Sequence, residues 1–324
     1  MAKAIRVHGY GGPEVLAYEN VEIAAPGPGQ VRVRQAAVGV NYIDVYFRTG
    51  AYKVPSLPYT PGNEGAGTIT AVGEGVTGLS VGQRVAYGTA QGCYAEEPVI
   101  EAKQVVVLPD AIDFDTGAAM MLKGLTAQYL LRRTFHVKRG DTILFHAAAG
   151  GVGLIACQWA KHLGCTVIGT VGSPDKAALA RENGCDHVIL YRDEDFAARV
   201  KEITGGAGCA VVYDGVGKAT FPASLDCLAP FGLFASFGSA SGKIEGFDIN
   251  LLSQKGSLYA TRPTLFTHVA KRETLETMAA DLFAVVASGA VKIPVHARAK
   301  LADAAQVHRD LESRRTTGAT VMHP

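Results

Sequence analysis

Small residues at regular spacing stand near the middle of the chain, where they could bind a phosphate. An apolar run ends at Phe145, and an amphipathic helical pattern begins at Val152. Between them, Ala147, Gly150 and Gly153 fit the pattern A-x-x-G-x-x-G, a variant of the dinucleotide fingerprint. Small side chains let the backbone approach a pyrophosphate, and the amides and dipole of a helix N-terminus favour its charge. A tight turn in an ordinary α/β domain is the alternative. The residues predicted to bind are Ala147, Gly150, Gly151, Val152 and Gly153.

The end of the next predicted strand bears on which dinucleotide would bind. An enzyme that uses NAD usually places Asp or Glu there, to accept hydrogen bonds from the ribose 2′-OH. Here the strand is followed by Gly172, and no acid stands directly at its end. Ser173 and Lys176 offer a hydroxyl and a cation that suit a 2′-phosphate, and Tyr191 could pack near the adenine ribose. The segment therefore favours NADPH, although Ser173 could simply cap a helix, Lys176 could be solvated, and Asp175 could be a displaced NAD acid.

The composition describes a folded protein with a large core. Hydrophobic residues make up 48% of the 324 residues and charged residues 19%, which excludes disorder and allows about two domains. A formal net charge of +1 argues against nucleic acid as a main partner. The six cysteines form no C-x-x-C pair, so we expect buried, reduced thiols in a cytoplasmic protein. We also expect no signal peptide and no membrane span.

The first 122 residues alternate short apolar runs with turn residues, which predicts mainly β-structure. Strand patterns cover residues 31–36, 65–73, 82–87 and 93–99, and the best helical signal covers residues 42–49 with Asn41 as N-cap. Many short strands with frequent turns predict a partly open β-barrel or sandwich.

From residue 115 onward the pattern changes to alternating helices and strands. A long helix is predicted over residues 115–133, and four more over residues 152–163, 175–183, 194–203 and 220–228. The six predicted strands comprise residues 142–146, 166–170, 187–190, 210–213, 233–237 and 257–260. This alternation predicts a doubly wound parallel sheet.

The remaining residues form a tail that we expect to return to the first domain. Helices are predicted over residues 271–287 and 301–312, and strands over residues 293–297 and 318–321. The predicted domains are therefore residues 1–122, 123–264 and 265–324, the last being the returning tail.

Motifs spread over the whole chain resemble one enzyme family, the zinc-free quinone oxidoreductases (the zeta-crystallin-like branch of the medium-chain dehydrogenase/reductase superfamily). The segments that carry the resemblance are residues 11–16, 39–44, 61–67, 123–127, 146–159, 213–217 and 262–263. The resemblance implies an α/β protein with a GroES-like β-barrel catalytic domain and a Rossmann domain. It further implies an active-site cleft between them, NADPH as cofactor, and a homodimer.

Zinc alcohol dehydrogenases share this superfamily, so a catalytic metal has to be considered. The places of their Cys, His and Cys ligands look like Asn41, Asn63 and Lys123 in this chain. Neutral amides are poor zinc ligands and a protonated lysine is none at all. The first domain also contains only Cys93, so the cysteine-rich lobe for structural zinc has no counterpart. We predict that no metal is bound.

Without zinc, hydrogen-bond donors or water must polarise the electron-accepting carbonyl. Asn41 and Lys123 are the first candidates for lining the nicotinamide pocket, with Asn41 also a cofactor contact, and Arg262 could point into the cleft. Tyr46 or Tyr52 could donate a hydrogen bond, or a proton, to a quinone oxygen. Local alternatives exist: Asn41 as a mere N-cap, Asp44 with Arg48 as an i,i+4 surface pair, and Tyr46 as core. No general acid is assigned, because a quinone can take protons from water.

Further cofactor contacts follow from the resemblance. The segment Phe237, Gly238 and Ser239 corresponds to a loop that lies against the nicotinamide in this family, although a plain glycine-rich connection fits the composition equally well. Thr126 lies in one of the resembling segments, and Arg314 could reach the 2′-phosphate from the returning tail. His146, at the end of the first strand of the predicted sheet, is expected to be a packed histidine rather than a base.

The resulting prediction is a cytoplasmic NADPH-dependent quinone reductase. One alternative is reduction of the activated C=C bond of an alkenal or enone, since both acceptors are conjugated carbonyls. Another is a non-catalytic NADPH-binding protein of the crystallin or RNA-binding kind, against which the near-neutral charge speaks.

Overall fold

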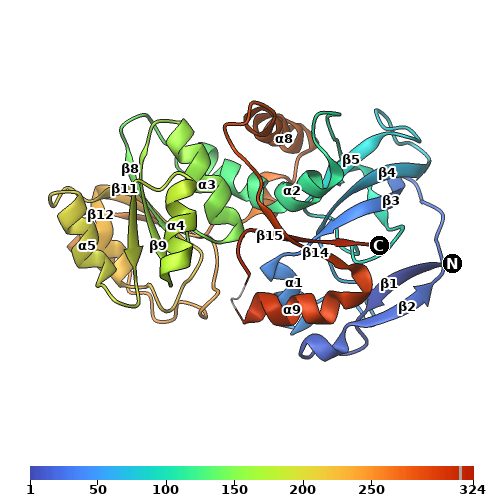
Figure 1. Ribbon diagram of the computed structural model, residues 1–324, viewed down its shortest axis with the longest axis horizontal. Coiled ribbons are helices and arrows are strands. Elements are labelled where there is room, and N and C mark those ends of the chain that lie inside the picture. The colour runs from blue at the N-terminus through green and yellow to red at the C-terminus, as the bar shows by residue number, and fades with distance from the viewer. Residues whose placement is uncertain (314–315) are drawn as a thin grey trace. The chain divides into compact units, whose positions relative to one another are not determined.

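The computed structural model describes residues 1–313 and 316–324 (Figure 1). The chain forms two compact units. Unit 1 comprises Met1–Leu125, Val269–Ala287 and Ile293–Pro324, and unit 2 comprises Thr126–His268 and Ser288–Lys292. The predicted domain limits after residues 122 and 264 lie close to these divisions, but residues 288–292 belong to unit 2 rather than to the tail.

A six-stranded parallel sheet forms the centre of unit 2, as the alternating pattern predicts. Its strand order is β10-β9-β8-β11-β12-β13, the doubly wound order in which the first strand, β8, lies inside the sheet. The strands are β8 (Thr142–His146), β9 (Thr166–Val171), β10 (His187–Leu190), β11 (Cys209–Asp214), β12 (Leu228–Ser236) and β13 (Tyr259–Thr261). Apolar residues such as Leu144, Ile168 and Val212 are fully buried, because helices cover both faces of such a sheet.

The connections of unit 2 are mostly the predicted helices. They are α3 (Gly151–His162), α4 (Pro174–Glu182), α5 (Phe196–Ile203), α6 (Asn250–Gln254) and α7 (Leu265–His268). The helix predicted over residues 220–228 is wrong in type and length: only the 3-10 turn η4 (Ala223–Cys227) forms. Pro222 cannot donate a helical hydrogen bond, and β12 already begins at Leu228, so no room is left for a longer helix.

Unit 1 is built on a seven-stranded sheet with one further hairpin. The main path is β14-β15-β3-β4-β5-β7, β6 pairs with β3, and β1 pairs with β2. The strands are β1 (Ala2–Arg6), β2 (Ala17–Val21), β3 (Gln30–Gly39), β4 (Glu64–Val72), β5 (Arg84–Tyr87), β6 (Val99–Glu101), β7 (Val106–Val107), β14 (Val295–Lys300) and β15 (Ala319–His323).

One predicted strand of unit 1, residues 93–99, is wrong except at its last residue. Ile5 donates to the carbonyl of Tyr94, whereas Gln35 donates to that of Glu96. Because the segment bonds alternately to two different strands, no continuous ladder forms, and only Val99 enters β6.

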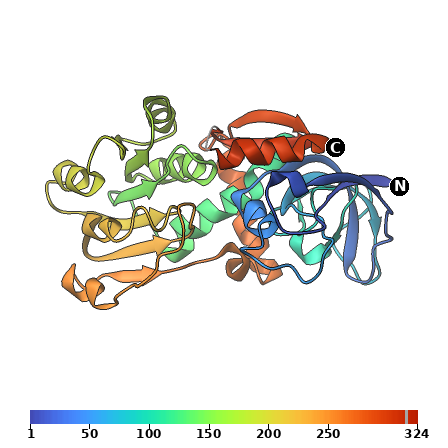
Figure 2. The same ribbon diagram turned by 90° about the horizontal axis from the view of Figure 1, so that it is seen from below.

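The helices of unit 1 lie around this sheet. They are η1 (Pro13–Val15), α1 (Tyr42–Arg48), η2 (Ala102–Gln104), α2 (Phe114–Tyr129), α8 (Arg272–Ala287), η5 (Leu301–Asp303) and α9 (Ala304–Glu312). The predicted long helix is α2, whose last turns widen into a π-helix, η3 (Leu130–Thr134), and the division between the units falls within α2. The tail adds β15 beside β3, and α9 packs along β14 and η1 (Figure 2).

Two further features bear on the sequence-based expectations. All six cysteines are buried and none forms a disulfide, as expected. Among the described residues, no helix has both the length and the apolar character needed to cross a membrane.

Candidate active site

The phosphate loop of unit 2 has the geometry that its small residues predict. Gly150 is the N-cap of the twelve-residue helix α3 and no side chain caps this end, so the first amides point out of the helix without intrahelical partners. A Cβ on Gly153 would lie 2.6 Å from the carbonyl oxygens of Ala147 and Ala148, so only glycine fits there. Ala147 has a φ of 55°, a left-handed conformation unusual for alanine and frequent at ligand sites. The loop therefore fits a dinucleotide pyrophosphate.

Hydroxyl groups and cationic side chains lie near the carboxyl end of β9. One of them, Arg192, was not predicted from the sequence. Ser173 is the N-cap of α4, yet its hydroxyl makes no capping hydrogen bond, so the simple capping alternative is not what the structure shows. A Cβ on Gly172 would lie 2.7 Å from Oη of Tyr191 and 3.5 Å from Nε of Arg192. Arg192 thus stands beside Gly172 with Tyr191 and the predicted Ser173 and Lys176. The only sequence signal for it was its position directly after Tyr191.

The loop after β12 lies close against the loop after β11. Phe237 donates through its amide to the carbonyl of Asp214 at 2.8 Å, and a Cβ on Gly238 would lie 2.4 Å from the carbonyl oxygen of Gly215. Arg262 donates through Nη1 to the carbonyl of Ser236 at 3.1 Å, which places the guanidinium at the end of β12, next to Phe237. The structure thus brings Arg262 together with the predicted nicotinamide loop, Phe237, Gly238 and Ser239.

His146 and Thr126 are both buried in unit 2. The imidazole of His146 bonds Oγ1 of Thr170 at 2.9 Å and Oγ of Ser224 at 3.0 Å, so the prediction of a packed histidine is confirmed. Burial lowers its pKa, which keeps the ring neutral. Thr126 lies one turn after Lys123 on α2.

In unit 1, two predicted site residues share one buried carboxylate. Oε2 of Glu64 accepts a hydrogen bond from Nδ2 of Asn41 at 2.7 Å and from Nζ of Lys123 at 2.9 Å. Its Oε1 accepts the backbone amide of Leu122 at 2.8 Å. All three side chains are buried, and Glu64 is fully so. Asn41 is the N-cap of α1, as predicted, but its amide group serves Glu64 as well. Glu64 was not singled out from the sequence, although it stands within the motif 61–67.

A second buried carboxylate, Asp44, binds both Asn41 and Asn63. Its Oδ2 accepts the backbone amide of Asn41 at 2.9 Å and the hydroxyl of Tyr94 at 3.0 Å, and its Oδ1 accepts Nδ2 of Asn63 at 2.7 Å. Complete burial raises the pKa of Asp44 to about 6, even though these donors and the charge of Lys123 act in the opposite direction. Asn41, Asn63 and Lys123 therefore belong to one hydrogen-bonded cluster.

The surface pair suggested for Asp44 and Arg48 does not form. Both residues are completely buried, and Arg48 instead makes a bidentate contact with Glu312 at 2.8 and 3.0 Å. It also donates to Nδ1 of His308 at 2.9 Å, and Nε2 of that ring bonds the Tyr94 hydroxyl at 3.0 Å. Burial and the nearby Arg48 lower the pKa of His308 to about 3. The i,i+4 spacing predicted the wrong partner for Arg48, because its true partners lie on α9, far along the chain.

Tyr46 and Tyr52 belong to an aromatic group at the end of α1. Their ring centroids lie 5.1 Å apart, and Tyr42 and Phe47 complete the group. Tyr52 is 40% exposed and Tyr46 is half-buried, so neither side chain belongs to the buried core. Both hydroxyls stay predicted substrate contacts.

The predicted role of Arg314 and the predicted absence of zinc both stay predictions. Arg314 lies outside the described residues. Among residues 1–313 and 316–324, no group of three or more His, Cys, Asp and Glu side chains could hold a metal ion, and the absence of zinc stays a prediction.

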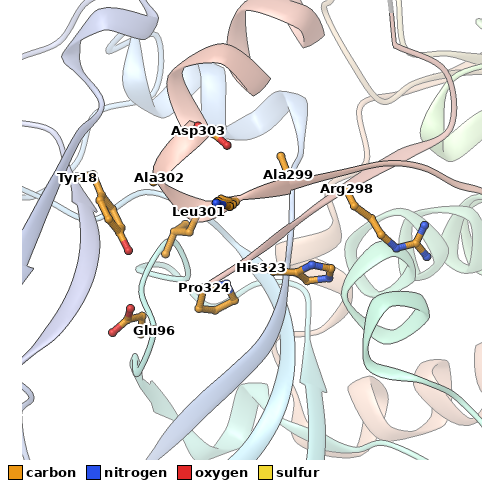
Figure 3. Close-up of a pocket in the computed structure, with 10 residues that line it drawn as sticks. Tyr18, Glu96, Arg298, Ala299, Leu301, Ala302, Asp303, His323 and Pro324 are labelled. Carbon is orange, nitrogen blue, oxygen red and sulfur yellow. The ribbon is translucent and has the colours of Figure 1, made fainter.

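A pocket of about 740 Å³ in unit 1 lies apart from the predicted site residues, none of which lines it. Tyr18 and Glu96 face each other on one side, and Arg298 and His323 lie on the other (Figure 3). The latter two are already engaged, since both bond Asp115 at 2.7 Å.

Comparison with known proteins matches both units. Residues 27–134 match the family described as "Alcohol dehydrogenase GroES-like domain", and residues 151–284 match "Zinc-binding dehydrogenase". The quinone oxidoreductase of Pseudomonas aeruginosa is 54% identical over 325 residues, covering 100% of both chains. The crystal structure of Escherichia coli quinone oxidoreductase complexed with NADPH is 47% identical over 100% of both chains, with a TM-score of 0.97. The 2-haloacrylate reductase of a Burkholderia species is 43% identical, covering 100% of this chain and 99% of that protein.

A GroES-like unit and a Rossmann unit with a phosphate loop define the class as a medium-chain dehydrogenase/reductase, that is, an oxidoreductase. Within that class, the chain belongs to the quinone oxidoreductase family.

Proposed function

We propose that this protein reduces quinones with NADPH and without zinc. The observation that carries the proposal is the buried cluster around Glu64, which holds the amide of Asn41 and the ammonium of Lys123 together. The family resemblance implies that these two residues stand where zinc-dependent relatives have metal ligands. The similarity to quinone oxidoreductases, one of them crystallised with NADPH, supports both the substrate class and the cofactor.

NADPH would bind to unit 2 through the groups described above. The amides at the start of α3 would hold the pyrophosphate, and Ser173, Lys176 and Arg192 would hold the 2′-phosphate. The loop of Phe237 to Ser239 would carry the nicotinamide. When bound, NADPH supplies the hydride, and the protein supplies position and electrostatics.

The quinone carbonyl would be polarised by unit 1. The ammonium of Lys123 has three N–H donors, of which Glu64 accepts one, so donors remain for a quinone oxygen. Glu64 fixes the ammonium and the Asn41 amide in one orientation, and a fixed donor in a buried site stabilises the negative charge that develops on the oxygen. Tyr46 and Tyr52 would contact the ring. Water can supply the protons that complete the hydroquinone.

A panel of acceptors tests this function. Oxidation of NADPH should be measured with 1,4-benzoquinone, 2-methyl-1,4-naphthoquinone, a 2-alkenal, an enone and 2-chloroacrylate, the last because of the 2-haloacrylate reductase relative. We expect the highest kcat/KM with quinones. Turnover of the C=C substrates alone would establish the alternative reductase. NADPH binding without any turnover, combined with RNA retention at physiological salt, would establish the non-catalytic alternative.

We further propose a cytoplasmic homodimer. The edge strand β13 leaves Tyr259 62% exposed, and Phe231 nearby is 68% exposed, so a second copy could cover both. Six unpaired cysteines suit a reducing compartment. Light scattering should give twice the chain mass, and Tyr259→Lys should shift it toward the monomer. A monomeric wild-type protein would overturn this proposal.

A further inference from the structure

Asn63 carries a buried acceptor that has no hydrogen-bond partner among the described residues. Its Oδ1 is shielded from solvent and bonds nothing there, whereas its Nδ2 donates to Oδ1 of Asp44 at 2.7 Å. An ionised carboxylate can only accept, so the nitrogen of the amide must face Asp44 and the oxygen must face away. A buried polar atom without a partner costs free energy, which would be recovered if this oxygen gained a donor.

The surroundings of Asp44 decide where a proton on this carboxyl would sit. Its Oδ2 already accepts two donors, the amide of Asn41 and the hydroxyl of Tyr94. From the residues that the structure describes, its Oδ1 accepts only Nδ2 of Asn63. A proton would therefore bind to Oδ1, where it would point at an N–H group. The Asn63 amide would then have to turn over, so that its oxygen accepts the new O–H and its nitrogen faces away from Asp44.

We propose that Asp44 and Asn63 form a proton-linked amide switch at the substrate carbonyl, in which ionised Asp44 makes Asn63 present its oxygen and protonated Asp44 makes it present its N–H groups. Asn63 is then a substrate contact, and Asp44 is a positioning residue that acts through it. Quinone oxygens are acceptors only, so the protonated state binds a quinone more tightly, and the proton is exchanged with solvent.

The inference rests on the proposed function, because it takes the free side of Asn63 to face the quinone. Placement supports this: Asn63 is hydrogen-bonded through Asp44 to Asn41, which shares Glu64 with Lys123. The same cluster thus holds the switch and the two donors assigned to the carbonyl.

Asp44 is the group of this cluster that changes charge near neutral pH. Burial raises its pKa to about 6. Burial also raises the pKa values of Tyr59, Cys93 and Tyr94, which stay neutral, and holds the pKa of His308 near 3, so that this ring is neutral as well. The remaining charged groups are Arg48, which is paired with Glu312, and Lys123, which is paired with Glu64.

Asp44→Asn imitates the protonated state. The new amide oxygen would accept from Asn41 and Tyr94, as Oδ2 does now. The new amide nitrogen would replace the protonated Oδ1 and donate to the oxygen of Asn63. The variant should therefore hold Asn63 with its N–H groups presented at every pH. Asn63→Leu has a similar volume and removes both donor and acceptor.

The test is the KM for 2-methyl-1,4-naphthoquinone from pH 5.5 to 8.5 at saturating NADPH, with the KM for NADPH measured alongside because its 2′-phosphate also titrates. In the wild type, the quinone KM should rise about fivefold with pH, as expected for loss of one hydrogen bond, with a midpoint near 6. Asp44→Asn should keep the low value throughout, and Asn63→Leu should give a high, flat value. A wild-type KM that does not vary, or an Asp44→Asn KM that still rises, would overturn the switch.

Tyr94→Phe provides a second variant in case Asp44→Asn fails to fold. It removes one donor to the ionised carboxylate, which raises the pKa of Asp44 and moves the midpoint to higher pH while the switch stays intact. An unmoved midpoint would contradict the assignment to Asp44.

A measurement without substrate separates this inference from the proposed function. In ¹³C- and ¹⁵N-labelled protein, the carboxyl signal of Asp44 and the side-chain NH₂ signals of Asn63 should shift with the same midpoint. Their joint titration together with no turnover of any quinone would reject the function but keep the amide switch. Titration of Asp44 without a change in the Asn63 amide would overturn the switch even if quinones are reduced.

Discussion

Lys123 and Glu64 form an ion pair at 2.9 Å in which both side chains are almost completely shielded from solvent. Such a pair contributes little net stability, because removing two charges from water costs about as much as their attraction returns. Its value here is orientation: the same carboxylate oxygen also binds Asn41, so one group fixes both donors assigned to the substrate carbonyl.

Glu64→Gln should therefore impair both stability and catalysis. It leaves the Lys123 ammonium buried without its counter-charge, which should cost about 3 kcal/mol of unfolding free energy and lower kcat/KM for quinones. Chemical denaturation and steady-state kinetics measure the two effects. Glu202→Gln, in an exposed ion pair with Arg199, is the matched control and should change neither. The double variant Glu64→Gln/Lys123→Met should regain much of the stability but not the activity, and a double variant no more stable than the single one would contradict this account.

Lys176→Ala should raise the KM for NADPH about tenfold and leave the KM for NADH nearly unchanged, because only NADPH has the 2′-phosphate. Arg192→Ala should act in the same direction, since Arg192 stands beside Gly172 at the end of β9. Lys201→Ala, at an exposed position on α5, is the control. Equal effects of Lys176→Ala on both cofactors would refute the assignment of the 2′-phosphate site.

Gly153→Ala should weaken NADPH binding without unfolding the protein. The added Cβ would lie 2.6 Å from two carbonyl oxygens of the phosphate loop, so the loop would have to move away from the helix N-terminus. Fluorescence titration with NADPH measures the affinity. Gly9→Ala adds a Cβ with nothing within 4 Å and should leave it unchanged. Unaltered NADPH affinity in Gly153→Ala would exclude this loop as the pyrophosphate site.

His308 should make the protein sensitive to acid. Its pKa is lowered to about 3, so in the pH range between 3 and its ordinary value near 6.5 the unfolded chain binds a proton that the folded chain does not. The stability linked to His308 is therefore present above pH 6.5 and decreases as the pH falls. His308→Gln should be less stable than the wild type at pH 7, because it loses the bonds to Arg48 and Tyr94. The difference should shrink by about 3 kcal/mol at pH 4.

Denaturation in urea at both pH values checks this prediction, with His8→Gln, an exposed histidine, as control. Asp44 acts in the opposite direction. Its raised pKa means that stability linked to it increases as the pH falls from 6 toward 4. Comparison of each variant with the wild type isolates the histidine. A difference that is the same at pH 7 and pH 4 would show that His308 is not held neutral.

Local patterns predicted most of the fold. The alternation of apolar runs and helical patterns located all six strands of the parallel sheet, because strands buried on both faces have a strong sequence signal. The strand predicted over residues 93–99 was wrong because the hydrogen bonds of this segment go to two separate strands, which no local pattern encodes. The helix predicted over residues 220–228 was wrong because the start of β12 leaves room only for the 3-10 turn η4, which is a tertiary effect.

The candidate site was only partly predictable for a similar reason. Asn41 and Lys123 could be selected because the family resemblance implies that they stand where zinc-dependent relatives have metal ligands. Glu64, which joins them, carries no spacing signal of its own. Arg48 was assigned to Asp44 by its i,i+4 spacing, yet its partners His308 and Glu312 lie 260 and 264 positions away. Buried charges find partners through the tertiary fold, so sequence spacing could not identify them.

The most direct test of the central claim is kcat/KM for 2-methyl-1,4-naphthoquinone in chelator-washed protein whose zinc content has been measured, with NADPH and NADH compared as reductants. We expect rapid reduction with NADPH, much slower reduction with NADH, and no dependence on added zinc. Stoichiometric zinc after washing, activity that requires added zinc, or no quinone reduction with NADPH would contradict the account.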